Sequence, residues 1–192
     1  MKASILAVAC LVPISTLGAE GIDFKGTAFG ASEQDFTAKH PRYRCSDASE
    51  RFRALNDRSC VIFGKPDKPF QEPKDRDGTF AGVPADIFVS FYDNRLHRIT
   101  VSVFASHFGT LLKALGDRYG MPDSLEKPRV QNRAGAEFEN VVAIWKRGEV
   151  SLRLEKYGRD LNTSSVSYVT DWGTEELKKR RGQEGKKAAG DI

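Results

Sequence analysis

The sequence predicts an α+β protein with two helix-plus-antiparallel-sheet units in tandem and the helices packed on one sheet face. Three observations lead to this prediction. Helix signals occur once in each half of the chain, and each is followed by alternating strands joined by turn residues. The composition, 40% hydrophobic and 29% charged over 192 residues, is that of a globular protein. The expected units span about residues 24–104 and 105–172.

The first unit is expected to open with a short helix. Ser32 can cap this helix, and Pro41 ends it. A short strand is predicted from Cys60 to Phe63, followed by an exposed Pro-, Asp- and Lys-rich loop over residues 64–78.

A β-hairpin should close the first unit. Its strands run from Pro84 to Tyr92 and from Arg95 to Phe104 and are joined by Asp93-Asn94. Apolar Ile99, Val101 and Val103 alternate with polar residues, which predicts one buried and one wetter face.

The second unit shows the clearest helix pattern. Ser106 can cap a helix that ends at Gly120 and carries its apolar residues on one face: Phe108, Leu111, Leu112, Leu115 and Tyr119. Three strands are expected to follow, over residues 140–146, 149–156 and 164–171.

The C-terminal segment, 173–192, is expected to begin as a helix at Thr174 that ends with Lys178 to Arg181. Residues 182–192 are rich in Gly, Lys and Ala and are expected to be disordered. Six bases and two acids fall within residues 177–192, whereas residues 20–176 hold 23 bases and 24 acids. The folded body is therefore nearly neutral, and the basic charge is concentrated in the tail.

The N-terminus has the pattern of a secretory signal peptide over residues 1–19. Lys2 precedes an apolar run from Ala3 to Ile14, and small or polar residues follow. An alternative is lipidation of Cys10, because Ala7-Val8-Ala9-Cys10 has the shape of a lipobox. We favour a soluble exported protein, periplasmic or secreted, because few apolar residues precede Cys10.

Cys45 and Cys60 are the cysteines that remain after residues 1–19. An even number of cysteines in an exported chain indicates a disulfide. The sequence therefore predicts a Cys45–Cys60 bond.

The sequence has no recognisable motif for catalysis, for a metal or for a cofactor. His40, His97 and His107 are scattered and suggest ordinary surface positions. Asp75-Arg76-Asp77-Gly78 resembles part of a calcium loop but lacks the later acidic ligand. Glu137 and Glu139 point the same way from one strand, as at a solvated strand end. We therefore expect no catalytic residues, no metal and no cofactor.

The most suggestive feature is the placement of aromatic and arginine side chains. If Ile87 and Val142 face the core, strand alternation turns five large side chains outward: Phe88, Tyr92, Arg98, Trp145 and Arg153. Tyr, Trp and Arg are enriched at protein-binding hot spots. These residues form the predicted protein-binding face, with packing against a second layer as the alternative.

Several short motifs together suggest a family. Phe29-Gly30-Ala31-Ser32, Phe36, Pro41, the paired cysteines and the run from Leu115 to Pro122 before a tryptophan hairpin resemble small periplasmic α+β modules. Beta-lactamase inhibitory protein and the small lipoprotein of the outer-membrane barrel-assembly machinery typify these modules. The resemblance is architectural and implies helices on one face of an antiparallel sheet, with the sheet or its rims binding protein.

The sequence thus favours an exported, non-catalytic periplasmic protein-binding module, either an envelope assembly factor or an inhibitor or immunity-type protein. Its expected partner is another envelope or secreted protein and not nucleic acid, since the basic tail has no aromatic residue to stack on bases. One alternative is a periplasmic enzyme whose site is assembled from dispersed residues. Another is an envelope structural component held at the anionic membrane surface by its basic tail.

Overall fold

The computed structural model describes residues 21–48, 57–62 and 78–190. Its main sheet contains β3 (Tyr43–Asp47), β4 (Arg58–Ile62), β7 (Asp86–Tyr92), β8 (Arg95–Phe104), β9 (Ser124–Glu126), β12 (Val142–Arg147), β13 (Val150–Asp160) and β14 (Thr163–Thr170). Small hairpins pair β1 (Asp23–Phe24) with β2 (Thr27–Ala28), β5 (Thr79–Phe80) with β6 (Val83–Pro84), and β10 (Arg129–Gln131) with β11 (Glu137–Glu139). The helices described are α1 (Glu33–Lys39), α2 (Phe108–Tyr119), the 3₁₀ turn η3 (Ala105–His107) and α3 (Asp171–Gly190).

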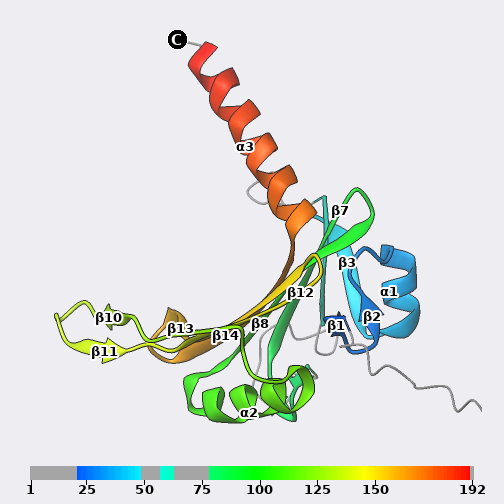
Figure 1. The fold of residues 1–192 in the computed structure, drawn as a ribbon. Coiled ribbons are helices and arrows are strands. Elements are labelled where there is room, and N and C mark those ends of the chain that lie inside the picture. Colours follow the sequence, from blue (N-terminus) through cyan, green and yellow to red (C-terminus); the bar gives the residue numbers. More distant parts are fainter. Residues whose placement is uncertain (1–20, 49–56, 63–77, 191–192) are drawn as a thin grey trace, which may run out of the picture.

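The main sheet has eight antiparallel strands in the order β3-β4-β7-β8-β14-β13-β12-β9 (Figure 1). The strands that follow α1 occupy one half of the sheet, and those that follow α2 occupy the other. The two sets meet where β8 pairs with β14. The predicted α+β class is confirmed.

The first helix forms where the sequence predicts it. The Ser32 hydroxyl accepts a hydrogen bond from the backbone N–H of Asp35 at 3.0 Å, so Ser32 is the N-cap of α1. Inside the helix, Phe36 is fully buried and its ring lies 5.7 Å from that of Phe91 on β7. This contact seats α1 on the sheet.

The second helix keeps its predicted apolar face but not its predicted cap. Leu111, Leu115 and Tyr119 are buried, and Gly120 ends α2 with a φ of +80°. The prediction that Ser106 caps the helix is wrong. Ser106 lies within η3, and neither η3 nor α2 has a side-chain capping hydrogen bond. The 3₁₀ turn leads from β8 into α2 and takes the place of the cap.

Both predicted hairpins form, although β7 begins at Asp86, two residues later than expected. The short strand predicted from Cys60 corresponds to β4. Asp93 and Asn94 have φ values of +48° and +54°, as a type I′ turn requires, and they connect β7 to β8. Gly148-Glu149 connects β12 to β13, one residue later than the predicted Arg147-Gly148, with Gly148 at φ +57°.

The strand register places the core on one face of the sheet. One row of cross-strand neighbours runs across seven strands: Trp145, Leu152, Tyr168, Ile99, Val89, Cys60 and Cys45. Its members belong to one apolar cluster with Phe36 of α1 and Leu111 of α2. The helices α1 and α2 therefore cover this face, which we call the inner face.

The outward orientation predicted for Trp145 is wrong. Trp145 is fully buried on the inner face, and its indole N–H donates to the carbonyl of Gly120 at 2.8 Å. The strand Val142-Ala143-Ile144-Trp145-Lys146 can alternate in either sense when it is considered alone. Pairing with β13 determines which side chains of β12 face inward, because Trp145 lies opposite the core residue Leu152.

The last helix is longer than predicted. α3 begins at Asp171 instead of Thr174 and continues to Gly190, beyond the predicted end at Arg181. Figure 1 shows α3 projecting away from the end of the sheet, so this helix does not share the inner face with α1 and α2.

Some predictions fall on residues outside the described ranges. The signal peptide over residues 1–19, Cys10, most of the loop over 64–78, and the calcium-loop fragment at Asp75 to Asp77 all lie there.

Trp145 gives a direct test of the core. Trp145→Ala removes a buried indole and its hydrogen bond, so the free energy of unfolding should fall by about 3–5 kcal/mol. Phe88→Ala is the control, since Phe88 is 37% exposed and its truncation leaves no core cavity. Urea denaturation of both variants measures the difference. Equal losses would contradict the burial of Trp145.

The Cys45–Cys60 disulfide forms between residues that lie directly opposite each other on β3 and β4. It closes a loop across a separation of 15 residues. In the chain-entropy model, replacing both cysteines by alanine should lower the free energy of unfolding by roughly 3 kcal/mol. Alkylation of the exported protein without reductant checks the bond itself, and two reactive thiols at these positions would refute it.

Candidate functional site

The face of the sheet opposite α1 and α2 is the first candidate site, and we call it the outer face. One row of its side chains crosses seven strands: Ile144, Arg153, Ser167, Thr100, Phe88, Val61 and Arg44. Phe88 and Arg153 are exposed, while the central Thr100 and Ser167 are short and half-buried. The centre of this face is thus a strip of small side chains flanked by larger ones.

Four of the five residues predicted for the binding face alternate with core residues and so belong to the outer face. Phe88 and Arg153 share the row described above. Arg98 lies one pair further along, opposite Ser90 and next to α3, and Tyr92 lies at the end of β7. Trp145 lies on the inner face instead.

Sequence reasoning missed Phe104 as a residue of this face. Phe104 is 55% exposed and follows Ser102 on the same side of β8. The alternation that singled out Arg98 extends to Phe104, so the signal was present. Phe104 and Phe88 give the outer face two exposed aromatic rings.

The second candidate site is a cleft of about 400 Å³ where α3 meets the turn between β7 and β8. Its lining comes from three separate segments: Asp57, Tyr92, Asp93, Arg95, Trp172, Glu176 and Arg180. Two aromatic rings, two guanidinium groups and three carboxylates therefore surround one opening.

Two arginines of this cleft, Arg180 and Arg95, stack on aromatic rings that also line it. The guanidinium of Arg180 lies 4.0 Å from the centre of the Tyr92 ring, and its Nε–H donates to the Tyr92 hydroxyl at 3.0 Å. Arg180 also forms an ion pair with Asp57 at 3.2 Å. On the opposite wall, Arg95 stacks 4.2 Å from the ring of Trp172. These contacts attach the first turns of α3 to the strands beneath.

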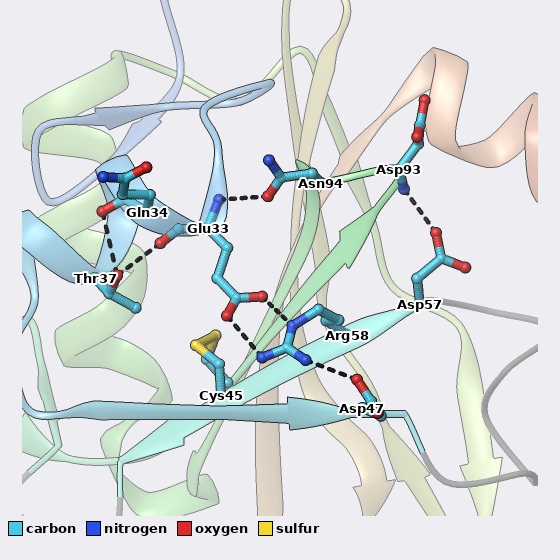
Figure 2. A network of polar contacts seen from close by, with 10 residues as sticks. Glu33, Gln34, Thr37, Cys45, Asp47, Asp57, Arg58, Asp93 and Asn94 are labelled. Atoms are coloured by element: carbon cyan, nitrogen blue, oxygen red, sulfur yellow. Dashed lines mark hydrogen bonds and ion pairs between the residues drawn. A yellow bond between two sulfur atoms is a disulfide. The ribbon is translucent and has the colours of Figure 1, made fainter.

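A polar network fixes Asp57 in place, and Figure 2 shows it. Asp57 accepts the backbone N–H of Asp93 at 2.7 Å, which ties the start of β4 to the β7–β8 turn. The neighbouring Arg58 forms ion pairs with Glu33 at the start of α1 and with Asp47 at the end of β3. The pKa of Arg58 is raised chiefly by its hydrogen bond to Glu33. The cleft is therefore built on a fixed corner of the sheet.

His97 is buried beside the cleft, so its predicted surface position is wrong. Its ring lies 6.3 Å from that of Tyr92 and 6.0 Å from that of Trp172. A β-bulge shifts the register here, since Ser90 pairs with Arg98 and Phe91 pairs with Leu96. His97 is thus the extra residue of the bulge, a feature that strand alternation does not reveal.

Among the described residues, neither ring nitrogen of His97 has a hydrogen-bond partner. Burial lowers the pKa of His97 to about 4, and the charge of Arg98 adds to the effect. The side chain is therefore neutral at neutral pH. Gly173 of α3 lies against it, because a Cβ at that position would come within 2.7 Å of Nδ1 of His97. Only glycine allows α3 to approach His97 this closely.

His40 is half-buried at the end of α1, with its Nε2 2.9 Å from the Thr27 hydroxyl, and His107 precedes α2. Glu137 and Glu139 are exposed and pair with Arg129 and Lys127, which confirms a solvated strand end. Within residues 21–48, 57–62 and 78–190, no group of His, Cys, Asp or Glu side chains is arranged to hold a metal ion.

Comparisons with protein-family models, curated proteins and solved structures find no match to this chain. Of the helices in the described part of the chain, none is long and apolar enough to cross a membrane. A Cys45–Cys60 disulfide is consistent with an oxidising compartment outside the cytoplasm.

The lowered pKa of buried His97 predicts that the stability of the protein depends on pH. Its pKa in the folded protein, about 4, lies below the ordinary value of 6.5. As the pH falls, the unfolded chain therefore binds this proton first. The free energy of unfolding should be unaffected above about pH 6.5 and should decrease between pH 6.5 and 4, by up to about 3 kcal/mol.

Comparison with His97→Gln isolates this effect from the titration of carboxylates. Urea denaturation between pH 7 and 4 should give a flatter profile for the variant than for the unmodified protein. Parallel profiles would show that His97 is accessible to protons in the folded state.

Proposed function

We propose that this chain is an exported, non-catalytic protein-binding module and that its outer sheet face binds the partner. The observation that supports this most directly is the composition of that face. It combines exposed Phe88, Phe104 and Arg153 with short, half-buried Ser and Thr side chains between them. Among the described residues, α3 reaches this side of the sheet only at one end.

The shape of the outer face favours a protein over a small molecule. Small ligands are bound in concave, largely apolar pockets, whereas a protein can cover a broad sheet surface. An aromatic ring flanked by short side chains offers area for a protruding loop or helix. Phe88 would be the apolar anchor, and Arg153 would lie near the edge of the contact.

The tandem architecture is part of the same proposal. The strand order supports it, because α1 precedes one group of four strands in the main sheet and α2 precedes the other. This arrangement is compatible with the resemblance to the periplasmic α+β modules described above. Such a module would act as an envelope assembly factor or as an inhibitor or immunity-type protein.

Export is the remaining part of the proposal. The signal-like pattern of residues 1–19 and the Cys45–Cys60 disulfide both support it. Mass spectrometry of the exported protein should find an N-terminus near Ala19 or Glu20. A lipidated Cys10 would instead show a lipoprotein.

The binding face can be tested with matched substitutions. Thr100→Arg and Ser167→Arg place long cationic side chains at the centre of the outer face, where the two residues are direct cross-strand neighbours. Thr110→Arg and Ser106→Arg make the same changes at exposed positions of α2 and η3 on the other side of the molecule. Each variant is used to capture proteins from the envelope fraction, and the captured proteins are quantified by mass spectrometry.

A partner that docks on the outer face should be reduced at least tenfold by both sheet substitutions and retained by both controls. A loss of that size corresponds to about 1.4 kcal/mol or more of binding free energy. Thermal unfolding of all four variants checks that they are folded. Failure of the unmodified protein to enrich any protein over an empty support, or equal loss in sheet and control variants, would contradict the proposal.

A further inference from the structure

The cleft between α3 and the β7–β8 turn is a formed cavity outside the central row of the outer face. Its volume of about 400 Å³ lies within the range typical of small-molecule sites. One face of α3 lines it from the helix side, because Trp172, Glu176 and Arg180 follow one another at intervals of four residues. The β7–β8 turn and the start of β4 line it from the sheet side.

Contacts within the chain hold the walls of this cleft in place. The Arg180 guanidinium lies 4.0 Å from the centre of the Tyr92 ring and pairs with Asp57 at 3.2 Å. Asp57 in turn accepts the backbone N–H of Asp93 at 2.7 Å, so that α3, β4 and the turn are joined around one opening. A site whose walls are already fixed loses less conformational entropy when a ligand binds.

Most of the charged groups at the cleft have partners within the chain. Arg180 pairs with Asp57, and Glu176 pairs with Lys179 at 2.5 Å. Asp93 and Arg95 differ from them. In the part of the chain that the structure describes, no ion pair or side-chain hydrogen bond involves the Asp93 carboxylate or the Arg95 guanidinium. The cavity therefore presents one anion and one cation that can pair with a ligand.

Arg95 is positioned as a hydrogen-bond donor. Its guanidinium lies 4.2 Å from the centre of the Trp172 ring, which is half-buried at the start of α3. A guanidinium stacked on a ring keeps its N–H groups, which lie in its own plane, available to acceptors. A carboxylate can accept two of these N–H groups in parallel. Arg95 thus favours a carboxylate in the cleft.

Asp93 supplies the complementary charge. It lies two residues before Arg95 in the same turn and lines the same cavity. Its φ of +48° is tolerated by Asp, but Asn and Gly satisfy the same turn. The turn therefore does not require the carboxylate, which places a negative charge near Arg95. A ligand that pairs with both residues must carry a cation and an anion close together.

We propose that this cleft binds a free α-amino acid, whose carboxylate pairs with Arg95 and whose ammonium group pairs with Asp93. In an α-amino acid the two groups are attached to one carbon, which matches an anion and a cation presented by a single turn. The volume of the cleft also leaves room for a side chain between the turn and α3. This inference does not rest on the proposed function, because the site requires no protein partner.

Titration of the ¹⁵N-labelled full chain tests the site. Of the two tryptophans only Trp172 lines the cleft, so its indole N–H resonance reports binding, and that of buried Trp145 is the internal control. The probes are glycine, L-phenylalanine, L-lysine and L-glutamate. At least one of them should shift the Trp172 resonance in a saturable manner and leave that of Trp145 nearly unchanged. No saturable shift with any of the four would overturn the proposal.

Two analogues of the amino acid that binds test which of its groups are recognised. The amide lacks the carboxylate, and the N-acetyl derivative lacks the ammonium group. Each should bind about tenfold or more weakly than the amino acid itself, because each loses one charge-assisted contact. Equal affinity for either analogue would show that the cleft does not recognise the α-amino acid group.

Matched substitutions assign the two contacts to residues. Arg95→Gln and Asp93→Asn each remove one charge, and Asn preserves the turn. Both should weaken binding of the amino acid about tenfold or more. Arg129→Gln and Glu137→Gln remove the same kinds of charge from the ion pair between β10 and β11, away from α3 (Figure 1), and should leave the affinity unchanged.

Thermal unfolding checks that all four variants are folded. Asp93→Asn and the two analogues keep the test decisive if Arg95→Gln loosens α3. Unchanged affinity in Asp93→Asn, or an equal loss in the variants of the β10–β11 ion pair, would reject the cleft as the amino-acid site.

Discussion

The pairing of β8 with β14 is the interaction on which the rest of the structure depends. It joins the strands that follow α1 to those that follow α2, and its register aligns Val101 with Val166 and Ile99 with Tyr168. Because side chains alternate along a strand, this alignment brings the apolar rows of both halves onto a single face. The helices α1 and α2 then cover that face together. The same register turns the alternate side chains of both halves toward the opposite side of the sheet, and these side chains form the outer face.

The corner beneath α3 combines groups that are unfavourable for stability. Within the part of the chain that the structure describes, neither ring nitrogen of His97 has a hydrogen-bond partner, and the buried Nε of Arg98 has none either. α3 approaches His97 through Gly173. Favourable contacts nearby offset this cost, chiefly the stacking of Arg180 on Tyr92 and of Arg95 on Trp172. Strained or unpaired groups held in place by their surroundings are typical of binding sites.

Local signals in the sequence were enough to predict the elements built from local contacts. Ser32 caps α1, and Asp93-Asn94 forms the turn of the first hairpin, because both depend on a few adjacent residues. The orientation of Trp145 was not predictable from β12 alone, since it depends on pairing with β13.

The candidate site was predictable only in part, because strand alternation is a local signal and the pairing between strands is not. Alternation placed Phe88, Arg98 and Arg153 on the outer face, but it could not detect the bulge that buries His97. A bulge adds one residue to one strand, and only the partner strand reveals it. The cleft beside α3 was also invisible, because Asp57, Tyr92 and Arg180 are distant in the chain. Sites assembled by tertiary packing leave no spacing pattern in the sequence.

The edges of the sheet give a further reason to place binding on its face. In the described part of the chain the outermost strands are β3 and β9. β9 has three residues, and β3 carries exposed Arg44 and Asp47 and is bonded to β4 through Cys45. Short or charged edges disfavour the addition of a strand from another chain. A partner that cannot extend the sheet must contact side chains instead. The outer face presents the exposed aromatic side chains of Phe88 and Phe104 for such a contact.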